Sequence, residues 1–226
     1  IYVNPTQFGP NEDLATYPRD FEHDELLCSH RGVDAVFYPD STAMYAPDHS
    51  TWVNEERLSA PLCGRARVGH FRGVTTIVTK LLNIVQPDLA VFGRKDAQQA
   101  LVIERMVRDL NIPVEIQVAP IVREKDGLAL SSRNKYLSPM ERVNALSLCR
   151  GLRAAEQRFA AGERDAAVLM ATVVTSLEQG GGRIDYVELL SRDTLQPLAV
   201  VDRPAVLAVA AFLGTTRLID NAFLDV

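Results

Sequence analysis

The sequence predicts an α/β protein built from a parallel-sheet domain followed by a smaller helix-plus-sheet domain. Up to residue 122, short apolar segments alternate with longer segments of helical period. Repeated strand–helix–strand order is typical of a parallel sheet covered by helices. Beyond that point, two long helical segments precede three strand-like segments. We place the boundary so that the two domains are residues 1–123 and 124–226.

The first domain contains a strongly amphipathic helix between residues 73 and 85. Six of its apolar residues stand at positions 74, 77, 78, 81, 82 and 85, the spacing of one helix face. Asp96 is a plausible N-cap for the helix that follows. In chain order we expect a strand end at 1–3, a helix at 21–32, a buried strand at 34–39, a long irregular stretch at 40–69, the helix at 73–85, a strand at 87–93, a helix at 96–110 and a strand at 112–122.

The second domain is expected to contain two helices and three strands. Three consecutive glycines, residues 180–182, end the second helix. The expected helices are 139–162 and 163–179, and the expected strands are 183–191, 205–214 and 215–224.

Composition narrows the class of partner. The chain has 226 residues with a formal net charge of -5, which argues against nucleic-acid binding through a basic face. No apolar run reaches the roughly 18 residues needed to cross a bilayer, so we expect no membrane partner. Cys28, Cys63 and Cys149 are far apart and form no CxxC pair, as expected of reduced thiols in the cytoplasm.

Three segments are candidates for a ligand site, because ligands of parallel sheets bind beyond the carboxyl ends of the strands. They are residues 4–9, 93–96 and 118–123. At the second of them, Gly93 lets a ligand approach the backbone, and Lys95 and Gln99 are four residues apart on one helix face. Asp96 suits sugar hydroxyls. The alternative is a solvated helix start capped by Asp96.

Polar side chains elsewhere have two interpretations each. Asn4 and Gln7 suit an uncharged hydroxy acid, or they cap a turn. His70 precedes a helix N-terminus that attracts anions, or it is a local hydrogen-bond partner. Asp24 is a minor candidate for a magnesium contact, although acids in the first turn of a helix also stabilise it.

The segment "DGLALSSRNKYL" has the groups that phosphate oxygens need. Ser131 and Ser132 carry hydroxyl donors, and Arg133 carries a planar fork of donors. The alternatives are a local serine turn and a surface arginine. Because neither GxxxxGK[ST] nor GxGxxG occurs in the sequence, a nucleotide would need another cradle.

Taken together, these segments resemble the pantoate–β-alanine ligase family of the nucleotidylyltransferase superfamily. The resemblance rests on "VNPTQFGPNEDLATYPR", "HFRGVTTIVTKLLNIVQPDLAVFGRKDAQQ", "REKDGLALSSRNKYL" and "LGTTRLIDN", in the family's order. It implies a Rossmann-like domain with a small C-terminal lid, and a cytoplasmic homodimer. It implies that ATP, with Mg²⁺, activates pantoate as an adenylate that β-alanine then attacks.

The resemblance also implies roles for individual residues. Gln7 and Gln99 would contact pantoate, with Asn4 and His70 also counted as substrate-binding. Gly93 and Asp96 would hold the ribose, Arg94 and Lys95 would lie at the ATP, with Lys95 on phosphate, and the Val122 backbone would meet the adenine. Leu130, Ser131, Ser132 and Arg133 match the phosphate-gripping loop, and with Lys95 the last three are the expected catalytic residues.

Two departures from the family pattern stand out. Arg94 occupies a place where the family usually has Glu or Gln. The family's HxGH motif is not among His23, His30, His49 and His70, so we expect a chain that lacks an N-terminal segment. The remaining alternatives are an inactive fragment that folds and dimerises, and a related adenylate-forming ligase for another hydroxy acid.

Overall fold

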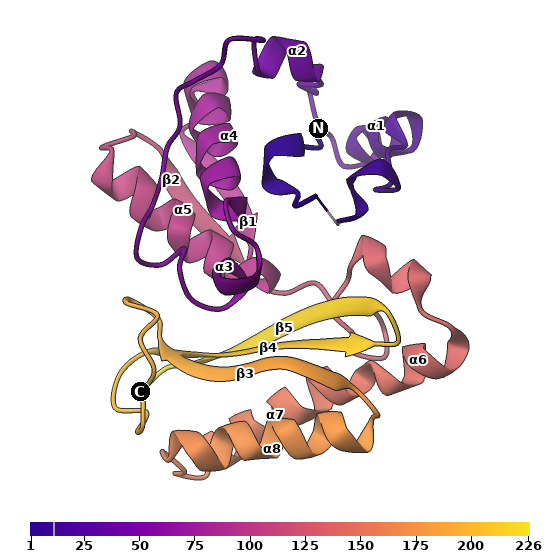
Figure 1. The fold of residues 1–226 in the computed structure, drawn as a ribbon, viewed down its shortest axis with the longest axis vertical. Helices are drawn as coiled ribbons and strands as arrows, with labels where there is room; N and C mark the ends of the chain where they lie inside the picture. The colour runs from indigo at the N-terminus through magenta and orange to yellow at the C-terminus, as the bar shows by residue number, and fades with distance from the viewer. Residues whose placement is uncertain (11) are drawn as a thin grey trace.

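Two separate sheets organise the chain (Figure 1). The structure is a computed structural model that describes residues 1–10 and 12–226. The first sheet has two parallel strands, β1 (Leu89–Gly93) and β2 (Glu115–Ala119). The second sheet has three antiparallel strands in the order β3-β4-β5. The predicted mixture of a parallel layer and a smaller helix-plus-sheet layer is confirmed.

The first half combines the parallel pair with five α-helices in the described residues. The α-helices are α1 (Phe21–His30), α2 (Ser41–Met44), α3 (Cys63–Ala66), α4 (His70–Val85) and α5 (Ala97–Asp109). Three short 3₁₀ helices accompany them: η1 (Pro5–Gln7), η2 (Asp13–Ala15) and η3 (Arg94–Asp96). Helices α4 and α5 share a buried apolar cluster that includes Val74, Ile103 and Met106.

Two expectations for the first half are wrong. Residues 34–39 form no strand, and Phe37 and Tyr38 are exposed. A strand needs a hydrogen-bonded neighbour, and among the described residues this segment has only the amino group of Ile1, which donates to the carbonyl of Phe37. Residues 1–3 are likewise not assigned to a strand.

The second half follows the predicted order closely. Its elements are η4 (Ser132–Tyr136), α6 (Pro139–Asn144), α7 (Leu146–Ala160), α8 (Ala166–Gln179), β3 (Arg183–Ser191), β4 (Ala205–Leu213) and β5 (Thr216–Leu224). A capping box between Ser138 and Glu141 starts α6. The single helix expected at 139–162 is two consecutive helices that meet at Ala145.

Strand β4 is the centre of the molecule, because both of its faces are buried. Helices α7 and α8 cover one face of the sheet, and the first half of the chain lies against the other (Figure 1). Leu207 and Val209 point into the cluster with α7 and α8. Val206 and Ala208, in alternate positions, point into a cluster with residues of the first half. Because successive side chains of a strand point to opposite faces of the sheet, β4 contributes to the hydrophobic clusters on both sides and so joins the two layers.

The segment between the two sheets is also attached to the second one. Arg123 donates from Nη1 and Nη2 to the carboxylate of Asp220 on β5, at 2.7 and 3.0 Å. The Asp220 side chain is only 1% exposed. The residues that follow Arg123 therefore begin from a fixed point beside β5. In the part of the chain that the structure describes, no helix is both long and apolar enough to cross a membrane.

Candidate active site

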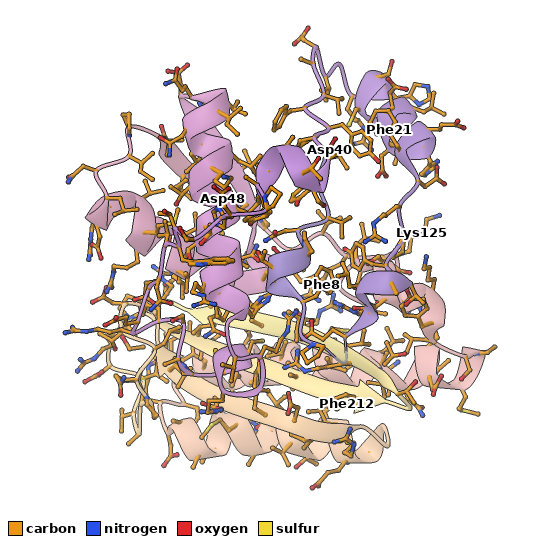
Figure 2. All side chains as sticks on the ribbon, turned by 45° about the horizontal axis from the view of Figure 1, so that its top comes forward. Phe8, Phe21, Asp40, Asp48, Lys125 and Phe212 are labelled. Carbon is orange, nitrogen blue, oxygen red and sulfur yellow. The ribbon has the colours of Figure 1, made fainter. Side chains whose placement is uncertain are left out.

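A cavity of about 350 Å³ lies beyond the carboxyl end of β1. Figure 2 shows Phe8, one of its lining residues, on the N-terminal segment where it faces the three-stranded sheet. Ten of the residues predicted from the sequence line this cavity: Asn4, Gln7, His70, Lys95, Asp96, Gln99, Leu130, Ser131, Ser132 and Arg133. These residues come from four separate segments of the chain, so the fold brings them together.

A second cavity, of about 100 Å³, continues from the first toward the three-stranded sheet. The two share a common wall formed by Arg67, His70, Lys95, Asp96, Gln99, Ser131 and Arg133. The far end of the second cavity is lined by Tyr186 and Arg217 from the sheet and by Cys63. The shared wall therefore faces connected cavities whose combined size is within the range of small-molecule sites.

The turn that carries Lys95 is held from the second half of the chain. Gly93 ends β1, and η3 leads directly into α5. The buried Asn221 on β5 donates from Nδ2 to the carbonyls of Arg94 and Lys95, at 2.8 and 3.0 Å. Asp96 occupies the N-cap position of α5 as predicted, but its side chain makes no capping hydrogen bond.

Asn4 and Gln7 form the opposite wall and differ in their roles. Asn4 is 3% exposed, and its Nδ2 donates to Gln7 Oε1 and to the carbonyl of Gly73, both at 3.1 Å. Its Oδ1 accepts from the hydroxyls of Thr6 and Tyr45. Asn4 thus shapes the turn. Gln7 Nε2 has no acceptor among the described residues, so this donor is the part of the turn that can bind a ligand.

His70 is neutral, and its two neighbours fix which ring nitrogen carries the proton. Its Nδ1 lies 2.7 Å from the carbonyl of Gln7, which only accepts, so Nδ1 carries the proton. Its Nε2 lies 3.0 Å from Arg67 Nη1, which only donates, so Nε2 is unprotonated. Burial and the adjacent charge of Arg67 lower the pKa of His70 to about 4. His70 is therefore a neutral positioning group for the Gln7 turn.

Two arginines of the shared wall are paired with consecutive acids. Arg133 donates from Nε and Nη2 to Asp13, at 3.1 and 2.8 Å, and this bonding holds the pKa of Asp13 below its usual value. Arg67 donates to Glu12 from Nε at 2.7 Å and from Nη2. Burial alone would raise the pKa of Glu12, but the hydrogen bond and charge of Arg67 outweigh it and lower that pKa.

Sequence reasoning missed Arg67, Glu12, Asp13 and Asn221 as parts of the site. Arg67 belongs to the segment 40–69, which was expected to be irregular. The length of this segment was the one feature of the sequence that indicated a binding role. Glu12 and Asp13 lie beside the Gln7 turn, but nothing in the sequence shows which cations they meet. The two long-range contacts of Asn221 depend on the docking of β5 against η3.

Four predicted residues are absent from the wall of either cavity. Gly93 is next to the wall, and a Cβ placed there would meet nothing within 4 Å. Arg94 points away from the site, with its guanidinium 5.1 Å from the ring of Phe223. Val122 is 66% exposed, and its carbonyl accepts from the amide of Leu130 at 2.9 Å, so the adenine contact stays a prediction.

Asp24, the fourth, lies apart from the other predicted residues. It lines a different hollow, with Asp20 and Asp40, and those two acids cap α1 and α2. Among residues 1–10 and 12–226, no group of three or more His, Cys, Asp or Glu side chains is arranged to hold a metal ion. The magnesium contact of Asp24 stays a prediction.

The wall offers chemistry suited to a polyanion beside a small polar acid. Lys95, Arg67 and Arg133 supply positive charge, and Ser131 and Ser132 supply hydroxyl donors. Such groups bind phosphate and carboxylate oxygens. The amides of Gln7 and Gln99 add uncharged donors and acceptors.

Comparison with known proteins identifies the family. The model of the pantoate-beta-alanine ligase family matches residues 1–223. The chain is 56% identical over 225 residues to the pantothenate synthetase of Thermotoga neapolitana, covering 99% of this chain and 80% of that protein.

Solved structures agree with this family assignment. The pantothenate synthetase of Thermus thermophilus has a TM-score of 0.95 at 44% identity, over 100% of this chain and 82% of that one. The pantoate-beta-alanine ligase of Francisella tularensis, complexed with beta-gamma ATP and beta-alanine, has a TM-score of 0.78 at 31% identity, over 98% of this chain and 77% of that one. With a family model matched along nearly its whole length and relatives of this similarity, the chain belongs to the pantoate–β-alanine ligase family.

Proposed function

We propose that the chain condenses pantoate with β-alanine at the expense of ATP, through a pantoyl adenylate. The observation that carries the proposal is the gathering of Gln7, Lys95, Gln99 and Arg133 around one cavity. Membership of the ligase family supports the overall reaction, and the Francisella relative complexed with beta-gamma ATP and beta-alanine supports ATP and β-alanine as substrates.

The chemistry requires two successive displacements. In the first, a pantoate carboxylate oxygen attacks the α-phosphorus of ATP, and pyrophosphate leaves. In the second, the β-alanine amine attacks the activated acyl carbon, AMP leaves, and the amine loses a proton. A carboxylate becomes an acyl donor only after its oxygen carries a good leaving group, so the site must first align pantoate with ATP.

The side chains divide this task by their chemistry. Gln7 Nε2 and the Gln99 amide are suited to the pantoate oxygens. Lys95, Ser131, Ser132 and Arg133 are suited to phosphate oxygens and to the charge that develops on the departing pyrophosphate. The open space over Gly93 and the carboxylate of Asp96 suit the ribose.

Magnesium fits this site only as a companion of the nucleotide. Asp96 lines the cavity, the nearby Glu12 and Asp13 are engaged with arginines, and the described residues contain no cluster of ligating side chains. Mg²⁺ commonly keeps several waters and binds substrate phosphates. We therefore treat Mg²⁺ as part of the ATP substrate and assign no step to a protein-bound metal.

The decisive experiment measures pyrophosphate release from ATP and Mg²⁺ as pantoate and then β-alanine are added. Release that requires pantoate and proceeds without β-alanine supports the adenylate. Release that requires both substrates together would refute the adenylate route, and no release from the folded chain would refute the proposed activity of this polypeptide. The Gln99→Ala variant should raise the KM for pantoate, whereas Gln157→Ala on the exposed face of α7 is the control.

We also propose the division of the chain into 1–123, which binds pantoate and nucleotide, and 124–226, which covers them. The two sheets lie on either side of this boundary. A cytoplasmic homodimer remains part of the proposal, and size-exclusion chromatography with light scattering tests the dimer.

A further inference from the structure

Glu12 and Asp13 place two carboxylates at a site whose proposed substrates are anions. Both acids lie in the segment around η2, directly after the Gln7 turn. Free carboxylates at such a site would repel ATP, so their presence needs a physical reason. Each accepts two hydrogen bonds from one arginine of the shared wall.

The Asp13–Arg133 pair has the geometry of an arginine–phosphate contact. Arg133 presents Nε and Nη2 side by side, and the two Asp13 oxygens accept one bond each. Phosphate oxygens use the same paired arrangement. Asp13 therefore occupies the donors that Arg133 would offer to ATP.

This pair can be exchanged without dismantling the core. The side chains of Arg133 and Asp13 are 38% and 25% exposed, and ion pairs in contact with water contribute little net stability. No residue described between 9 and 16 is buried.

The η2 segment, residues 9–16, is also attached to the rest of the protein by few contacts. Among its described residues, the hydrogen bonds to distant parts of the chain are those of Glu12 with Arg67 and of Asp13 with Arg133. The remaining bonds are local, such as Thr16 to the carbonyl of Asp13. Release of Asp13 from Arg133 therefore breaks one of two attachments of this segment.

We propose that Asp13 is an internal competitor of ATP. In the free protein Asp13 pairs with Arg133, and when ATP binds, the ATP phosphates replace Asp13 as the partner of Arg133. This rests on the proposed phosphate-binding role of Arg133. Asp13 then lowers ATP affinity and prevents other small anions from occupying Arg133. The neighbouring Glu12–Arg67 pair keeps the segment attached during the exchange.

The test compares ATP binding by titration calorimetry, with Mg²⁺ and without pantoate, in wild type, Asp13→Asn, Arg133→Ala and the double variant. Asp13→Asn should bind ATP about fivefold more tightly, as expected for loss of a competing pair worth about 1 kcal/mol. Glu25→Gln, which removes the same charge from the exposed face of α1, should stay within twofold of wild type. Asp13→Ala is a second variant, and thermal unfolding checks the fold of each.

The double variant separates competition from a general loss of negative charge. If Asp13 acts through Arg133, Asp13→Asn has no effect in the Arg133→Ala background. Equal tightening in both backgrounds, or no tightening in wild type, would overturn the proposal. If Arg133→Ala itself binds ATP as well as wild type does, the assignment of Arg133 to phosphate fails, and the competition fails with it.

Discussion

Replacing Gly73 by alanine should disable the pantoate side of the site from a position that touches no substrate. Gly73 lies in α4, where that helix passes the Gln7 turn. A Cβ at residue 73 would lie 2.5 Å from the carbonyl oxygen of Thr6 and 2.8 Å from the amide nitrogen of Gln7. Ordinary contact begins near 3.4 Å. The turn would therefore have to move by about 0.9 Å, and it is backbone that must move.

The expected changes in stability and activity differ in size. Alanine in a helix interior is about 1 kcal/mol more favourable than glycine, whereas overpacking costs about 1–3 kcal/mol, so the net loss of stability is at most about 2 kcal/mol. Displacement of a substrate-positioning group by about 1 Å can cost about 100-fold in rate. We therefore expect kcat/KM for pantoate to fall about 100-fold in a protein that remains folded.

Two assays check this prediction: urea unfolding and pantoate-dependent pyrophosphate release. Gly182→Ala is the matched control, because its Cβ would have nothing nearer than 3.4 Å. Gln7→Ala completes the set. Normal activity in Gly73→Ala but not in Gln7→Ala would show that the turn tolerates the shift, and the packing argument would be wrong. Normal activity in both would remove Gln7 from the pantoate site.

Three further predictions follow from the same geometry. Because the pKa of His70 is about 4 in the folded chain and near its ordinary 6.5 when unfolded, its contribution to stability is complete above pH 6.5 and is lost as the pH falls toward 4. Urea unfolding should show up to about 3 kcal/mol of this pH dependence, and His70→Asn should remove it. Asn221→Ala should raise the KM for ATP several-fold by freeing the Lys95 turn, whereas Asn83→Ala on α4 should not; an unchanged KM would contradict the supporting role of Asn221. Gly93→Ala should leave the unfolding free energy nearly unchanged, since its Cβ meets nothing within 4 Å, and should weaken ATP binding; full ATP affinity would show that no ligand approaches this backbone.

The sequence predicted best those elements whose local pattern is independent of distant contacts. The apolar spacing of α4 identified the helix, although it begins three residues earlier, at His70. Strand β3 has the predicted limits. The segment 34–39 has an equally apolar pattern but lacks a paired neighbour among the described residues, and sequence alone could not show that. Strand pairing is a property of the tertiary structure.

The same distinction applies to the site. Residues such as Lys95 and Ser131 were identified because each lies within a short motif, and the structure brings them to one cavity. Arg67 was missed because its importance comes mainly from contacts that are distant in sequence. Its side chain meets Glu12 and the Gln7 carbonyl across more than 50 residues, whereas its side-chain contact with the ring of His70 is local. Counter-ions can be recognised only when both partners are located.

The packing of the two halves limits how the cavity can close. Leu58, Leu62 and Val102 from the first half are buried in one cluster with Leu190 and Leu195 from the second. Exposing a fully buried Leu or Val side chain costs about 1.5–3 kcal/mol, so a wide separation of the halves would cost a large part of the roughly 5–15 kcal/mol that stabilises a typical protein.

We therefore expect any closure over ATP to use the connecting segment, residues 123–133, rather than a swing of the whole three-stranded sheet. That segment is fixed at one end by Arg123 on Asp220, and it carries Arg133 at the other, paired across the cavity with Asp13. A phosphate that replaces Asp13 as the partner of Arg133 would alter the contacts of this end of the segment. The apolar cluster between the two halves would stay intact. The cavity can then respond to ATP through the exchange of one ion pair, at a small fraction of the free energy needed to part the two halves.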